Sequence, residues 1–102
     1  MRPFEIEVRD GSGVTTVSVN GELDIATSEQ LDAVLSRLQE TDSTVVLDLA
    51  GCEFVDSTGL RAILRGAGAW DGSLAGGGRR LAIAGASEPV RRVLAISGVG
   101  AA

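Results

Sequence analysis

The sequence predicts a single α/β domain over residues 1–102, with a mixed β-sheet of about four strands, helices packed on it, and the order β-β-α-β-α-β-α. Two runs of alternating apolar and polar residues open the chain, separated by the turn residues of 10–13. Strand and helix patterns then alternate over the last three quarters. Helical crossovers join parallel strands and short turns join antiparallel ones, so we expect a parallel sheet with an antiparallel N-terminal hairpin.

The hairpin is predicted from residues 4–8 and 15–19, where every second residue is apolar or small, as in strands with one buried face. Asn20 and Gly21 are turn residues, and we expect the second strand to end at them. These two strands are therefore expected to form an antiparallel hairpin within the predicted sheet.

The first helix is predicted to begin at Thr27, because Thr27 and Gln30 fit a capping box in which Gln30 reaches back to the Thr27 backbone N–H. From 31 to 38 the leucines and valine recur at i, i+3, i+4 and i+7, which gives one apolar stripe. We therefore expect an ordinary amphipathic helix lying on the sheet.

The second half of the chain supplies two more strand–helix pairs. Residues 44–49 are β-branched and mostly apolar, which favours a strand at the centre of the sheet, and the helical pattern of 60–67 follows. Residues 71–78 contain four glycines and predict a loop, and 80–84 predict the fourth strand. A last helix is expected over 87–98, capped by serine at its start and by glycine at its end.

Composition excludes several classes of protein. The 102 residues are 44% hydrophobic and 23% charged, which suits one globular core. A net charge of -5, with arginine as the only cation, argues against direct nucleic-acid binding. With one cysteine, Cys52, and no histidine, we expect no disulfide, no metal site, no cofactor and no histidine-based catalysis, and hence no enzyme. The chain shows no signal peptide and no apolar run that could insert into a membrane, so we expect a cytoplasmic protein.

The sequence Asp56-Ser57-Thr58-Gly59-Leu60 marks the candidate site, because it offers two hydroxyls where a strand gives way to a helix. The first backbone N–H groups of a helix lack partners and its dipole is positive there, so a phosphorylated side chain is accommodated. Ser57 is the candidate phosphorylation site. The alternative is structural: Asp56 or Ser57 caps the helix, and Gly59 relieves crowding in its first turn.

A second loop, containing Asp24, follows the second predicted strand. In open α/β sheets, sites gather at the carboxyl ends of the strands, so we expect Asp24 to lie near Asp56 and Ser57. For both aspartates, ordinary turn and cap roles remain open.

Three segments together resemble a STAS domain of the anti-sigma factor antagonist family: Asn-Gly-Glu-Leu-Asp at 20–24, Asp-Ser-Thr-Gly-Leu at 56–60, and the stretch from Arg91 to Gly98. The resemblance covers essentially the whole chain in order. Gly-Glu-Leu-Asp and Asp-Ser-Thr-Gly-Leu at this separation are far more specific together than either motif is alone.

The resemblance implies partner switching. Ser57 matches the serine that is phosphorylated by a partner that is both a serine kinase and an anti-sigma factor. The unphosphorylated antagonist binds that partner and frees the sigma factor; phosphorylation blocks binding until a phosphoserine phosphatase reverses it. Asp24, Asp56, Ser57, Thr58 and Gly59 would then line the binding face, with Gly59 keeping the surface low for the partner.

Two further expectations follow from the resemblance. Family members usually continue with a further strand and helix, and their absence from this chain is expected to expose a strand edge or apolar patch that favours self-association. The alternative function is a STAS module without the switch, acting as a scaffold subunit or as the soluble partner of a membrane transporter.

Overall fold

The computed structural model describes residues 3–38, 44–70 and 81–97, which form five strands and three helices. The elements are β1 (Glu5–Asp10), β2 (Val14–Leu23), α1 (Ser28–Leu38), β3 (Thr44–Asp48), β4 (Cys52–Val55), α2 (Ser57–Trp70), β5 (Leu81–Ala84) and α3 (Glu88–Ser97). The expected loop at 71–78 and the expected glycine cap at Gly98 lie outside the described residues.

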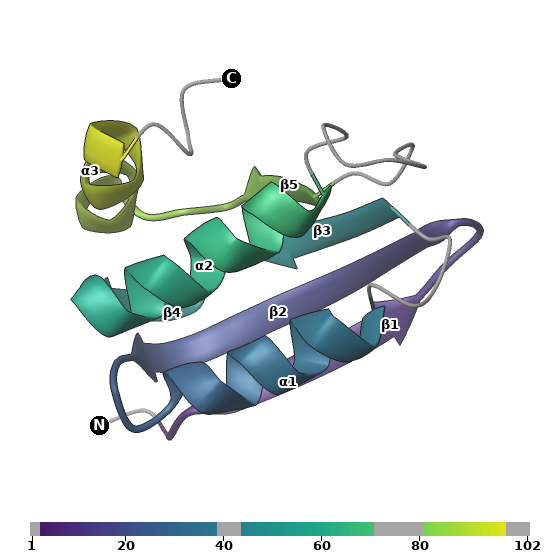
Figure 1. Cartoon of the computed structure of the whole chain (residues 1–102), viewed down its shortest axis with the longest axis horizontal. Helices are drawn as coiled ribbons and strands as arrows, with labels where there is room; N and C mark the ends of the chain where they lie inside the picture. The colour runs from purple at the N-terminus through teal and green to yellow at the C-terminus, as the bar shows by residue number, and fades with distance from the viewer. Residues whose placement is uncertain (1–2, 39–43, 71–80, 98–102) are drawn as a thin grey trace.

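The five strands form one mixed sheet in the order β1-β2-β3-β5, with β4 also paired to β2 (Figure 1). β1 and β2 are antiparallel, and Val8 lies opposite Val17. All other strand pairs are parallel. The α/β class, the N-terminal hairpin and the central place of β3 are therefore confirmed.

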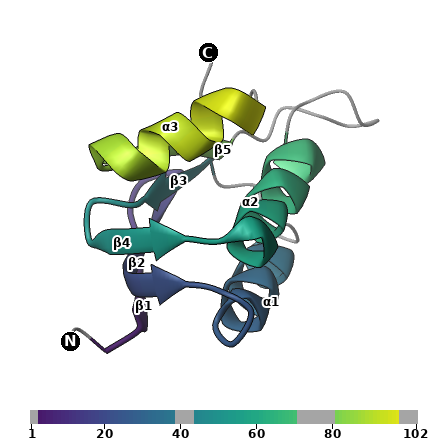
Figure 2. The same cartoon turned by 90° about the vertical axis from the view of Figure 1, so that its left-hand side faces the viewer.

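The sheet has five strands rather than the expected four, because β4 was not predicted. β2 is ten residues long; it pairs with β3 through residues 14–18 and with β4 through 21–23. β3 and β4 thus follow one another along the same side of β2, opposite β1 (Figure 2). In the segment between β3 and β4, the Leu49 N–H donates to the Ala84 carbonyl at 2.9 Å, so the chain is bonded to the end of β5 before it returns to β2.

The expected end of β2 at Asn20 and Gly21 is wrong, since the strand continues to Leu23. Gly21 has a φ of +96°, and the pairing with β4 shifts register between Gly21 and Glu22. A Cβ at Gly21 would lie 3.0 Å from the Cα of Phe4. The glycine therefore bends the strand past Phe4 without ending it.

Two helices, α1 and α2, lie side by side on one face of the sheet, and α3 packs beside β4 (Figure 2). The buried side chains between these layers form one apolar core. Its larger members are Val17, Val19, Leu23, Leu31, Leu35, Val45, Leu47, Leu49, Ile63 and Val90. Each fully buried aliphatic side chain contributes about 1.5–3 kcal/mol. This core fixes the helices, and with them the sheet end where β2 and β4 finish.

Candidate functional site

The carboxyl ends of β2 and β4 lie next to each other. Leu23 is paired with Val55, and the Asp56 N–H donates to the Leu23 carbonyl oxygen at 3.1 Å. The loop that begins with Asp24 and the helix that begins after Asp56 therefore leave the sheet side by side. The expectation that the two motifs meet is confirmed.

Asp24 organises the loop between β2 and α1. Its Oδ1 accepts hydrogen bonds from the N–H groups of Ala26 at 3.0 Å and Thr27 at 3.2 Å. Its carbonyl oxygen accepts from the Ser28 N–H at 2.8 Å. Asp24 is half-buried, and most of its hydrogen-bonding capacity holds this turn.

The expected capping box at Thr27 does not form as predicted. The Thr27 hydroxyl donates to the Glu22 carbonyl at 2.8 Å and accepts the Asp24 N–H at 2.9 Å, so it faces the preceding strand and not the helix. α1 begins at Ser28, and the side chain that satisfies N–H groups before it is the Asp24 carboxylate. The Thr27 hydroxyl closes the loop instead.

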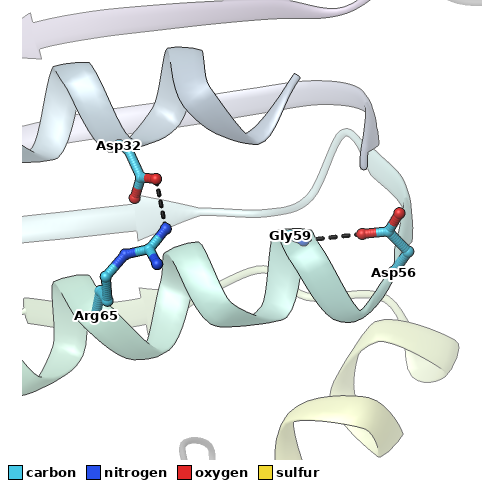
Figure 3. A network of polar contacts seen from close by, with 4 residues as sticks. All are labelled: Asp32, Asp56, Gly59 and Arg65. Carbon is cyan, nitrogen blue, oxygen red and sulfur yellow. Dashed lines mark hydrogen bonds and ion pairs between the residues drawn. The ribbon is translucent and has the colours of Figure 1, made fainter. Parts of the chain in front are cut away.

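Asp56 is the N-cap of α2. Its Oδ1 accepts the Gly59 N–H at 2.8 Å (Figure 3), and its carbonyl accepts the Leu60 N–H at 2.8 Å. A carboxylate that bonds the third N–H of a helix satisfies one of its free donors and complements the positive end of the dipole. The structural role considered for Asp56 is therefore present.

Because the Asp56 carboxylate caps α2, the Ser57 side chain is not needed as the cap. It is the first residue of α2 and is exposed, while Thr58 is half-buried. Within the described part of the chain, no hydrogen bond involves the Ser57 hydroxyl. Of the two neighbouring hydroxyls, that of Ser57 is the more open to a partner enzyme.

Gly59 has a different role from the one expected. It is buried, and a Cβ built on it would lie 2.5 Å from the Leu23 carbonyl oxygen and 2.8 Å from Leu23 Cγ. Its missing side chain therefore faces β2, where α2 approaches the sheet closely. The expectation that this glycine keeps an outward surface low is wrong, and the alternative of relieved crowding is closer to what the structure shows.

Two apolar side chains at this end of the sheet were not identified from the sequence. Ile25 is 74% exposed in the loop after Asp24, and Phe54, on β4, is 49% exposed. Ile25 could have been identified from the sequence, because it is an apolar residue in a predicted turn and belongs to no periodic apolar pattern that would place it in the core. Contiguous exposed apolar area rimmed by polar residues is typical of protein–protein contacts, whereas single exposed apolar side chains are common on any surface.

Cys52 lies at the start of β4 and is buried. Its Sγ contacts the Phe54 carbonyl at 3.5 Å. Burial raises the pKa of the thiol. In the residues that the structure describes, no three metal-ligating side chains come together, and no helix is long and apolar enough to span a membrane.

Comparisons with known proteins agree with the fold and the motifs. A family model described as "Mlab, STAS domain" matches residues 6–101. An anti-sigma F factor antagonist of Paenibacillus polymyxa is 35% identical over 100 residues, which cover 94% of this chain and 80% of that protein. The crystal structure of an anti-sigma factor antagonist from Mycobacterium paratuberculosis has a TM-score of 0.79 and 26% identity, covering 95% of this chain and 80% of that one.

A third relative matches over a shorter stretch. The anti-sigma-F factor antagonist RsfB of Mycobacterium tuberculosis is 32% identical over 59 residues, 57% of this chain, and the match spans about half (48%) of that relative. The chain belongs to the STAS domain family. The relatives from Paenibacillus polymyxa and Mycobacterium tuberculosis are named anti-sigma factor antagonists, which confirms the resemblance drawn from the motifs.

Proposed function

We propose that this protein is an anti-sigma factor antagonist that is switched by phosphorylation of Ser57. The observation that carries the proposal is that Asp56, and not Ser57, caps α2. Asp56 caps the helix, so the adjacent Ser57 hydroxyl is exposed and free to react. The relatives named as antagonists favour this function over a STAS module that does not switch.

The proposed chemistry needs an outside enzyme. The Ser57 oxygen attacks the γ-phosphorus of ATP bound to an anti-sigma factor with serine kinase activity, the bond to ADP breaks, and the hydroxyl proton passes to a base of the kinase. A phosphoserine phosphatase then restores the hydroxyl with water. We infer a cytoplasmic location, since both ATP and sigma factors are found there.

The proposed binding face consists of Ser57, Thr58, Asp24 and the exposed Ile25 and Phe54. Ile25 and Phe54 provide apolar area, and Ser57 lies at the adjacent helix start. A phosphate adds about -1.5 to -2 charges and three acceptor oxygens, which an apolar interface cannot accommodate without a cationic partner. Asp56 and Gly59 contribute indirectly, because they position the start of α2.

Intact mass spectrometry tests the proposal. The chain is incubated with ATP, Mg²⁺ and a kinase-bearing anti-sigma factor from the same genome, and we expect the mass of one phosphate to be added. Ser57→Ala should abolish the addition, and the matched variant Thr58→Ala should reduce it less. Phosphate mapped mainly to Thr58, or full labelling of Ser57→Ala, would contradict the assignment of Ser57.

A binding measurement tests the switch itself. Calorimetry should show that the unphosphorylated chain binds the anti-sigma factor and that the phosphorylated chain binds it at least about tenfold more weakly. Equal affinities would favour the STAS module without a switch.

A further inference from the structure

β1 is an edge strand of the sheet, and within the described residues no strand pairs with its outer side. Five of its six residues are exposed, and Val8 is 46% exposed although it lies on the same face as the buried Val17. The unpaired N–H and C=O groups of such an edge are a template for another strand.

The hydrogen-bond pattern of the hairpin identifies which groups of β1 face outward. The Gly11 N–H donates to the Val14 carbonyl at 2.6 Å, which marks the hydrogen-bonded pair beside the turn. Bonded and non-bonded pairs alternate along an antiparallel ladder. Counting back along the register, the odd-numbered residues of β1 bond to β2. Ile6, Val8 and Asp10 therefore direct their N–H and C=O groups away from the sheet.

We propose that β1 pairs antiparallel with β1 of a second copy of this chain, with Val8 opposite Val8 on a two-fold axis. In this register the outward groups of Val8 bond each other, and those of Ile6 bond those of Asp10. On the opposite face, Glu7 of each copy lies across from Arg9 of the other, in a non-hydrogen-bonded pair where side chains are closest.

Charge selects this register over its neighbours. A shift by two residues in one direction places Glu7 opposite Glu7, although Glu5 then lies opposite Arg9, and a shift in the other direction places Arg9 opposite Arg9. Like charges directly opposite each other are destabilising. A shift by one residue places apolar side chains on the wrong face of the sheet. Of these registers, the proposed one alone pairs Glu7 with Arg9 and places no like charges directly opposite each other.

The helix side of β1 provides apolar area for the same contact. A groove of about 230 Å³ between β1 and α1 is lined by Val8, Val34, Arg37 and Leu38. Pairing on the two-fold axis places the second copy's Val8 against the open side of this groove. The interface is isologous, since each copy contributes the same surface, and the pairing covers both edges.

This surface is separate from the proposed switch. β1 and β4 lie on opposite sides of β2, and Ser57 follows β4. Self-association through β1 therefore does not depend on the proposed function.

Sedimentation equilibrium with charge-reversal variants tests the proposal. The wild-type chain should form a dimer as its concentration rises. Glu7→Arg should weaken the dimer at least about tenfold, because the new arginine of each copy would lie opposite Arg9 of the other. The double variant Glu7→Arg/Arg9→Glu should restore affinity to within about threefold, because each pair again has opposite charges. Glu5→Arg is the matched control: it makes the same change in net charge, but residue 5 has only Gly11 opposite it.

A second variant tests the backbone contact. Val8→Pro removes an N–H that faces outward and that makes no bond to β2, so the hairpin should remain folded by circular dichroism while the dimer is lost. A wild-type chain that stays monomeric at about 1 mM would overturn the proposal. A double variant that fails to restore the dimer, or a Glu5→Arg as damaging as Glu7→Arg, would overturn it as well.

Discussion

At the scale of single residues, the site depends on how Asp56 and Ser57 divide two tasks. Either side chain can cap a helix, and the sequence leaves both possibilities open. The structure gives the cap to Asp56, whose Oδ1 accepts the Gly59 N–H. A serine that held that bond would use the same oxygen both to accept the helix N–H and to carry the phosphate. The aspartate before Ser57 therefore keeps the helix start intact whether or not Ser57 is modified.

Gly59→Ala tests the close approach of α2 to β2. Alanine is favoured over glycine in helices by about 0.5–1 kcal/mol, so an unhindered position would gain stability. Here the new Cβ meets the Leu23 carbonyl oxygen at 2.5 Å, so backbone must move. We expect a net loss of about 1–3 kcal/mol, as in overpacked cores.

Urea unfolding measures that loss. Leu23→Ala in the Gly59→Ala background should fail to rescue stability, because it removes the side-chain contact and leaves the carbonyl contact. An unchanged or higher midpoint for Gly59→Ala would mean that the strand and helix are not held this closely.

Burial of Cys52 predicts a dependence of stability on pH. Because burial raises the pKa of the thiol in the folded chain, the folded state holds its proton more tightly than the unfolded state does. The contribution of Cys52 to the free energy of unfolding should therefore be fully present below the ordinary thiol pKa of about 8.5 and should be lost as the pH rises above it. Denaturant titrations at several alkaline pH values should show this slope in the wild type and a shallower slope in Cys52→Ala. The same slope in both proteins would assign it to other groups.

At the scale of secondary-structure elements, α1 and α2 are joined by an ion pair between Asp32 and Arg65 at 2.5 Å (Figure 3). The two side chains are 33% and 62% exposed, so water screens their attraction. Exposed pairs contribute about 0.2–1 kcal/mol, and we expect a coupling energy at the low end of that range. A double-mutant cycle of Asp32→Ala and Arg65→Ala, measured by urea unfolding, checks this. Coupling well above about 1 kcal/mol would contradict the expectation that water screens this pair.

The elements also show what sequence patterns predict and what they miss. Hydrophobic periodicity located both hairpin strands and the helices, because one buried face leaves a regular trace in the sequence, and the β-branched, apolar run of 44–49 located β3. β4 was missed because it is four residues long and only its two end residues are buried. A strand that short has no period to detect, and its existence depends on the extension of β2 past Gly21.

The candidate site was predictable in part for the same reason. A strand followed by a helix predicts where Ser57 and Asp24 lie, because parallel strands bring their carboxyl ends to one edge. The close contact between Gly59 and Leu23 was not predictable, since it depends on how near α2 approaches β2 in three dimensions. The exposure of Phe54 likewise follows from the tertiary arrangement.

At the scale of the whole molecule, the question is whether phosphorylation acts by unfolding or by changing a surface. Ser57 is exposed at the edge of the fold, and the core lies between the sheet and the helices beneath it. An anion in the first turn of a helix is favourable by about 0.3–1 kcal/mol, which offsets repulsion from the nearby Asp56. The fold should therefore tolerate the charge, and the change should be confined to the binding face.

Ser57→Asp, which carries less charge than a phosphate, separates these two mechanisms. We expect its thermal midpoint to equal that of the wild type or to be slightly higher, while its affinity for the anti-sigma factor falls at least about tenfold, or 1.4 kcal/mol. Ser57→Asn is the matched control, because it has the same size without the charge and should keep more of the affinity. Calorimetry of all three proteins decides the matter. If affinity falls only together with a large drop in midpoint, the charge at Ser57 acts by disrupting α2, and the surface mechanism fails.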